Sequence, residues 1–378
     1  MSTQTTTALR ASICAAAVAS LSVRECLETF HERRDVLLQS WQDTTRAALV
    51  EAGFLRNADL NLLAAQLLLL TSMLDNDPNE LWSLFGTVLR LAQSQGLHRD
   101  GEVLGLKKNV LESEMRRRVW WYLVTLDARL AELVGADTSS ARTDTRIPLH
   151  VNDADLAPDM QSVPPERAEA CDMTFCRLKY EIAQFTARKP PLPTQSLLLS
   201  QLEGSLEARY LRSLDPVDPV QFLSSLATRS SLCKLRQATT LSLADRTVAY
   251  DNLIHASPSL ARFLWHVRFF FPWGAPVFTL QFLAAHPDWD AAATKAFNTL
   301  LQLYAHHPEF LEEAATNVTG RILGGLMLKA WAVRESFLKE KGGDVNVPAT
   351  VEALQVRQAV EQVDASIDLL DWSWDIPY

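Results

Sequence analysis

An aromatic segment near residue 270 holds polar side chains of the kind that bind or transform a small molecule. The segment contains Trp265, His266, Arg268, Phe269, Phe270 and Trp273. Ligand pockets are mostly apolar and carry a few placed polar groups, so these residues are candidates for the wall of an apolar cavity. An imidazole titrates near neutral pH, which makes His266 a candidate acid or base. The alternative, that the segment is hydrophobic core, stays open.

Asp127 is the second candidate for chemistry. It falls among Leu123, Leu126 and Leu130, at spacings that place a carboxylate on an apolar helix face. An unpaired buried charge is very costly, so we expect Asp127 to join a buried polar network or to contact a ligand. The expected network consists of Arg90, His98, Arg99, Arg117 and Asp127. If the chain is an enzyme, His266 and Asp127 are its catalytic candidates.

Other catalytic and metal-binding patterns are missing from the sequence. There is no Gly-x-Ser-x-Gly elbow, no phosphate-binding glycine-rich loop and no His-Glu-x-x-His. The five cysteines include no Cys-x-x-Cys pair, and their odd number and wide spacing favour a reducing compartment. The adjacent His306 and His307 would need a further ligand, so the sequence assigns no metal site and no cofactor.

Charge and hydrophobicity argue against nucleic acid and membrane as direct binding partners of this chain. The net charge is -9, whereas nucleic-acid-binding modules usually present a basic face. No apolar stretch reaches the ~20 residues of a membrane span, and the Ala- and Ser-rich run after Arg10 indicates a first packed helix rather than a signal peptide. We therefore expect an intracellular protein, nuclear or cytoplasmic, without membrane contact and without direct DNA binding by this chain alone.

Hydrophobic periodicity predicts an all-α fold, a single bundle-like body of many helices with long irregular loops. Residues 1–8 are expected to be a disordered end, and residues 9–378 the helical domain. Apolar residues recur every three or four positions through 111–134, the strongest helix in the sequence. Residues 135–166, rich in Gly, Pro, Asp and Ser, predict a long irregular segment that is functional or covers the core.

Two ordered motifs resemble a known family. The first reads Gly86-x3-Arg90-x-Ala92-x3-Gly96-Leu97-His98-Arg99-Asp100. The second follows fourteen residues later and reads Glu114-x-Arg116-Arg117-Arg118-Val119-Trp120-Trp121-x-Leu123-x2-Leu126-Asp127. Together they resemble the fungal-specific transcription factor domain, the middle homology region of zinc-cluster transcription factors, most sharply over residues 80–160.

This resemblance implies a helical regulatory domain, often one that senses small molecules. The family's DNA-binding module uses six closely spaced cysteines, and nothing in this sequence matches it. Where the family often has Gly-Arg-Pro, this chain has Gly135, Ala136 and Asp137. We interpret the run from Arg116 to Arg118 as a salt-bridged helix face rather than a DNA contact, and expect one of Trp120 and Trp121 in the core and the other under a loop.

Three hypotheses about function remain. The first is a transcription-regulator-like protein, a domain that senses a small apolar ligand and acts without its own zinc cluster. The second is the same helical scaffold used as a biosynthetic enzyme, a cyclase, isomerase or dehydratase on an apolar secondary metabolite. The third is an interaction module that pairs with a protein partner or forms a homodimer.

Overall fold

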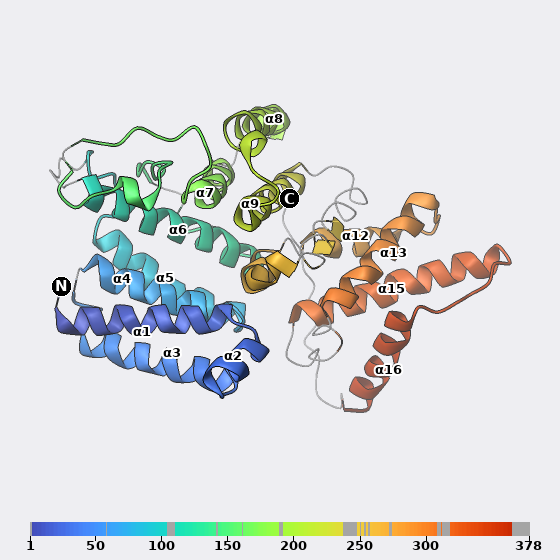
Figure 1. The fold of residues 1–378 in the computed structure, drawn as a ribbon. Coiled ribbons are helices and arrows are strands. Elements are labelled where there is room, and N and C mark those ends of the chain that lie inside the picture. The colour runs from blue at the N-terminus through green and yellow to red at the C-terminus, as the bar shows by residue number, and fades with distance from the viewer. Residues whose placement is uncertain are drawn as a thin grey trace. The chain divides into compact units, whose positions relative to one another are not determined.

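The fold is all-α, as the sequence predicts. The computed structural model describes residues 2–57, 59–103, 110–140, 143–160, 162–188, 192–236, 248–249, 251–252, 255, 258–271, 274–307, 311 and 318–364. Within these ranges the chain forms α-helices and three short 3-10 helices and no strand (Figure 1). None of the described helices combines the length and the apolar character needed to cross a lipid bilayer.

Contacts divide the chain into two compact units, where the sequence indicates one body. Unit 1 contains residues 1–232 and 257–271, and unit 2 contains residues 233–256 and 272–378. Both units are helical and similar in composition, so no shift in residue type marks the boundary between them.

Unit 1 begins with a layer of packed helices, drawn in blue in Figure 1. These helices are α1 (Thr3–Ser20), α2 (Val23–Phe30), α3 (Arg34–Glu51) and α4 (Leu60–Ser72). α1 packs against both α3 and α4. α1 starts at Thr3, earlier than the expected residue 9, because the Ser2 side chain accepts a hydrogen bond from the Thr5 backbone N–H and caps the first turn.

The largest hydrophobic core of unit 1 lies between α4 and the next helices of the chain. They are α5 (Pro78–Ser94), α6 (Val110–Val134) and α7 (Thr174–Ala187). Pro78 occupies the first turn of α5, and the Asp77 carboxylate caps it. Trp120 and Leu126 of α6 are completely or almost completely buried against Phe85 of α5. α6 is therefore the central helix of this unit.

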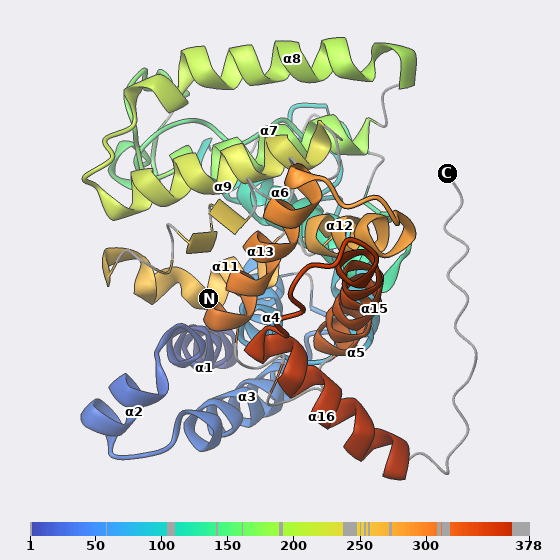
Figure 2. The ribbon, with the colours of Figure 1, turned by 90° about the vertical axis from the view of Figure 1, so that its right-hand side faces the viewer.

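The remaining helices of unit 1 come from two parts of the sequence. They are α8 (Leu192–Arg209), η2 (Leu211–Ser213), α9 (Pro219–Leu235), η3 (Pro258–Phe263) and α11 (Leu264–Phe270). Figure 2 shows α8 as one long helix at the top of the view. The short 3-10 helix η1 (Asp153–Asp155) interrupts the irregular segment after α6.

Unit 2 is a smaller helical body. It contains α12 (Gly274–Ala285), α13 (Ala291–His306), α15 (Val318–Glu340) and α16 (Ala349–Asp364), drawn in orange to red in Figure 2. α12 packs against α13 and α15, and α15 packs against α16. Phe297 and Trp331 are buried with their ring centroids 6.0 Å apart, which places an aromatic core between α13 and α15.

Candidate functional site

Buried polar groups of α6 hold the irregular segment after it in place. The indole Nε1 of Trp121 donates to the Arg146 carbonyl at 2.8 Å. The Glu114 carboxylate accepts the Leu149 backbone N–H at 3.0 Å. Trp120 and Trp121 are both buried in the same core, whereas we expected only one of them there, and Trp121 in addition reaches the loop with its N–H. The segment is a fixed cover over α6, although it has almost no regular structure.

Arg117 forms a buried ion pair under this cover. Its Nε donates to Asp100 at 2.9 Å and its Nη2 donates to Glu102 at 3.2 Å. Burial raises the pKa of Asp100, but hydrogen bonds from Arg117 and from the Arg146 backbone outweigh it and hold the pKa at about 2. The neighbouring Arg118 pairs with Glu114. Two of the three arginines of this run therefore form ion pairs, and Arg116 donates to the Gln95 carbonyl at 2.8 Å.

The other members of the expected network lie apart from Arg117. Arg90 is exposed and reaches Gln93 of its own helix. Arg99 is exposed and pairs with Asp144 at 2.6 Å. The His98 ring lies against the Trp120 indole, with the ring centroids 6.0 Å apart. His98 and Arg99 contact the start of the covering segment, and none of these three residues hydrogen-bonds to Asp127.

Asp127 is completely buried and holds the loop that follows α6. Its Oδ2 accepts the backbone N–H groups of Ser139 and Ser140 at 2.8 and 2.7 Å. Its Oδ1 has no hydrogen-bond partner among the described residues. A carboxylate that accepts backbone amides fixes loop geometry, so the structure gives Asp127 a positioning contact with the chain itself.

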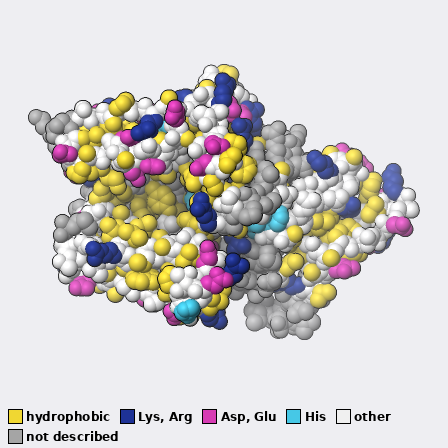
Figure 3. Space-filling view, in the orientation of Figure 1, with side chains coloured by type: hydrophobic (Ala, Val, Ile, Leu, Met, Phe, Trp, Pro, Cys, Tyr) yellow, Lys and Arg dark blue, Asp and Glu magenta, His cyan; other side chains and the backbone are white. Residues whose placement is uncertain are grey.

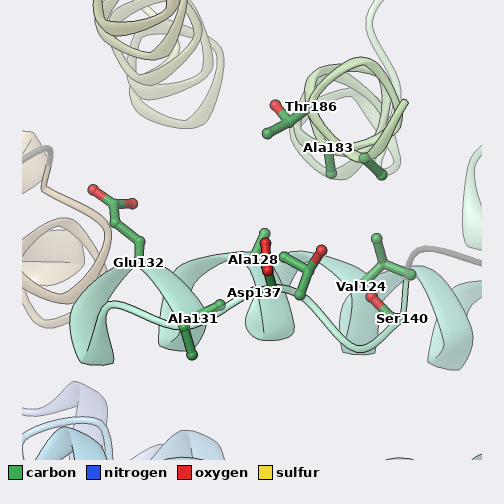
Figure 4. A pocket seen from close by; sticks show the side chains of 11 residues that line it. Val124, Ala128, Ala131, Glu132, Asp137, Ser140, Ala183 and Thr186 are labelled. Atoms are coloured by element: carbon green, nitrogen blue, oxygen red, sulfur yellow. The ribbon is translucent and has the colours of Figure 1, made fainter. Parts of the chain in front are cut away.

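An open pocket of about 220 Å³ lies between this loop, α6 and α7. Figure 4 shows Val124, Ala128 and Ala131 of α6 on one side, with Ala183 and Thr186 of α7 opposite. The remaining lining residues are Glu132, Ala136, Asp137, Thr138, Ser140 and Ala187. Small side chains on both helices leave this volume free. Figure 3 shows a hollow lined with hydrophobic side chains in unit 1.

Arg129 joins α6 to α11 beside this pocket. Its Nε donates to the Phe269 carbonyl at 2.5 Å and its Nη2 donates to the Phe271 carbonyl at 2.8 Å. Its Nη1 pairs with Glu132, a lining residue of the pocket, at 3.0 Å. The last carbonyls of a helix lack hydrogen-bond partners within the helix, so Arg129 supplies donors that α11 cannot. A positively charged side chain at this end also interacts favourably with the helix dipole.

Lys179 of α7 meets His266 of α11 among aromatic rings. Its Nζ lies 3.3 Å from His266 Nε2 and 3.3 Å from the centre of the Phe270 ring. Burial lowers the pKa of Lys179 to about 7, and burial followed by the nearby Lys179 charge lowers the pKa of His266 well below its ordinary value. No carboxylate among the described residues pairs with Lys179. The imidazole is therefore neutral at neutral pH, whereas the amine is divided between its charged and neutral forms, and the neutral amine is nucleophilic.

The aromatic residues near position 270 have two kinds of neighbour: some contact the Lys179–His266 pair and others lie in the core. Trp265 lies against His266, with the ring centroids 5.4 Å apart. Phe269 is buried and its ring lies 5.7 Å from the Arg129 guanidinium. Arg268 is exposed. Trp273 lies outside the described residues.

Sequence reasoning missed the residues of α7. Phe175, Lys179 and Ala183 follow one another at four-residue spacing, so one helix face carries both the amine and a wall of the pocket. The pairing of Lys179 with a residue 87 positions away has no local signal in the sequence.

Comparison with known proteins decides the family. The fungal specific transcription factor domain matches residues 1–246. The chain belongs to this family.

Curated proteins similar to this fungal specific transcription factor domain are named as regulators. The chain is 32% identical to the aurofusarin cluster transcription factor aurR2 of Gibberella zeae, over 91% of this chain and 56% of that protein. It is 28% identical to the transcriptional regulator AacuB of Aspergillus aculeatus, over 96% of this chain and 54% of that protein. The chain therefore spans about half the length of these relatives. No solved structure matches it.

The family match covers most of the candidate site. Asp127, Arg129 and Lys179 lie inside residues 1–246, as does every lining residue of the pocket. His266 and the rest of α11 lie beyond the match, although α11 belongs to unit 1. The fungal specific transcription factor domain of this chain is thus completed by a helix from further along the sequence.

Proposed function

We propose that this chain is a regulatory domain of transcription control that responds to a small apolar ligand. The observation that carries the ligand proposal is the pocket between α6 and α7, where alanine and valine supply six of the eleven lining residues. The buried Asp127 carboxylate holds the loop that closes one side of this pocket. A ligand that fills the pocket would contact α6, α7 and the loop at once, so its binding would stabilise their arrangement.

The proposed regulator acts in the nucleus through another DNA-binding element. The chain carries a net charge of -9 and no closely spaced cysteine set, so we propose that DNA contact is made by a partner chain or by a further part of the protein. The names of the curated relatives support the regulatory role. The ligand response is an independent part of the proposal.

A pocket-filling substitution tests the ligand response. Purified chain is incubated with a lipophilic extract of its source, and native mass spectrometry measures any retained molecule. We expect the wild type to retain a small molecule and Ala128→Leu, which fills the pocket from α6, to lose it. Ala47→Leu is the matched control, because Ala47 is an exposed alanine on α3. Equal retention by all three proteins would exclude the pocket as the binding site.

The transcriptional role has a separate test. The chain is fused to a heterologous DNA-binding domain, and a reporter gene is measured with and without the retained molecule. We expect a ligand-dependent change in reporter output that Ala128→Leu abolishes and Ala47→Leu preserves. A reporter that responds equally in both variants would contradict sensing through this pocket.

One observation favours an enzyme as the second candidate function. Lys179 and His266 form a pair with lowered pKa values inside an aromatic surround, and such pairs occur at sites of acid–base and nucleophilic chemistry. The test is conversion of a molecule in the same extract. Conversion that is lost in folded His266→Ala would support this candidate, whereas unchanged extract would remove it.

A further inference from the structure

Three histidines of unit 2 surround one buried carboxylate. Asp251 and His255 are four residues apart on one helical turn, and the His255 Nδ1 lies 3.3 Å from Asp251 Oδ1. His306 is the last residue of α13, and its Nδ1 lies 3.0 Å from Asp251 Oδ2. His307 follows directly, and its Nε2 lies 3.2 Å from Asp251 Oδ1. The chain thus brings together residues more than fifty positions apart.

Imidazoles supply the ion-pair partners of this carboxylate. Asp251 is completely buried, and its ion-pair partners within the described residues are imidazoles. A buried carboxylate is best stabilised by a full positive charge, and an imidazole supplies one only when it is protonated. A bound cation would supply the charge without protonation.

The geometry suits a small transition-metal ion. One ligand atom each from Asp251, His255 and His306 lies within 4.8 Å of the other two. The Nδ1 atoms of His255 and His306 both lie beside the carboxylate, and the two rings are stacked with centroids 4.5 Å apart, so one ring must tilt before both rings can bind one ion. Zinc bonds of 2.0–2.1 Å in a tetrahedron separate ligand atoms by about 3.3 Å, so coordination requires these side chains to draw together and one of the two stacked rings to rotate.

Two further features point to a cation at this place. The Nε2 of His255 is buried and has no hydrogen-bond partner among the described residues, so hydrogen bonding alone does not satisfy the cluster. His306 lies at the carboxyl end of α13, a helix of 16 residues, where the helix dipole favours positive charge. The neighbouring His307 is buried and holds the carboxylate by its second contact.

We propose that Asp251, His255 and His306 bind one divalent transition-metal ion of the zinc type, with His307 as a positioning residue for the carboxylate. Two imidazoles and one carboxylate match the ligand preference of zinc among the common biological cations. Three protein ligands leave a fourth position open. Unit 2 therefore gains a metal site that joins α13 to the helical turn of Asp251.

Metal titration of the whole purified chain tests this inference. The protein is stripped with a chelator, and isothermal titration with zinc chloride measures affinity and stoichiometry. We expect one zinc ion per chain and a higher melting temperature with zinc than without it. His306→Gln and His255→Gln should each lower the zinc affinity by at least about 100-fold. Loss of a residue that only supports a metal ligand costs 10–100-fold, and loss of the ligand itself should cost more.

An exposed histidine of the same unit provides the control. His286→Gln removes an exposed imidazole near the end of α12 and should leave zinc affinity unchanged. Cobalt absorption of the wild type gives a readout independent of variant folding, since a four-coordinate site yields intense visible bands. Absence of these bands, or equal zinc affinity in His306→Gln and His286→Gln, would overturn the proposal.

Discussion

The guanidinium of Arg129 donates to the carbonyl oxygen of Phe269, 140 residues further along the chain, at 2.5 Å. A second donor of the same side chain reaches the Phe271 carbonyl. A short helix such as α11 is marginal by itself, so its position depends on this arginine and on its apolar contacts. Arg129 therefore fixes the helix that carries His266.

Substitution of Arg129 tests this dependence. Arg129→Met leaves two carbonyl groups without their donors, and we expect it to destabilise unit 1 by about 3 kcal/mol and to open residues 258–271 locally. Hydrogen exchange of peptides from this segment measures the opening. Arg90→Met is the control, because Arg90 is exposed and should change stability by less than about 0.5 kcal/mol. Equal exchange in the two variants would show that α11 is held by packing alone.

The loop at the pocket depends on the Asp127 carboxylate. Asp127→Ala removes the acceptor of two backbone amides, so we expect faster hydrogen exchange at Ser139 and Ser140 and a loss of about 2–4 kcal/mol. Asp127→Asn keeps one acceptor oxygen in place and should retain most of the protection. Unchanged exchange in the alanine variant would mean that the amides find other acceptors.

Lys179 should make stability rise with pH. Its pKa is lowered to about 7 by burial, whereas an unfolded lysine keeps its ordinary value near 10.5. Between these values the unfolded chain binds the extra proton, so the free energy of unfolding increases as the pH rises. We therefore expect Lys179→Met to raise the melting temperature more at pH 6 than at pH 9. A pH-independent difference would place the amine in water.

The Asp100 carboxylate should contribute stability that is lost in acid. Its pKa is lowered from 3.8 to about 2, so its contribution is full above pH 4 and is lost as the pH falls through 2. Asp100→Asn leaves Arg117 buried without its main partner, and we expect a loss of about 3–5 kcal/mol at neutral pH. Urea unfolding at pH 7 and pH 3 measures it. A loss that does not shrink at pH 3 would contradict the ion-pair explanation.

Local patterns in the sequence predicted the helices well. The spacing of Leu123, Leu126 and Leu130 reflects the buried face of α6, and Pro78 marks the start of α5. The first turn of α1 was missed because its cap depends on a single serine, Ser2, in a threonine-rich end. Helix periodicity is a property of neighbouring residues, so it is visible without the fold.

The contacts of the candidate site were harder to foresee. The sequence favoured cationic partners for Asp127, but the structure supplies backbone N–H groups. Every residue except proline has such a group, so the residue types do not show which ones will be used. Lys179 resembles an ordinary surface lysine until the fold places His266 beside it. His306 stands out in the sequence, whereas its neighbour Asp251 does not. The roles of His266 and of the aromatic segment stay predictions.

Unit 1 is built from two stretches of sequence, and this has a genetic consequence. The chain passes between the units at residues 232, 256 and 271. A stop codon at the end of the family match, after residue 246, would delete α11 together with most of unit 2. Arg129 would then face no helix end, and Lys179 would lose its imidazole neighbour. A truncating allele at this position should therefore behave as a loss of both units. A shortened protein made to contain unit 1 must extend at least to residue 271.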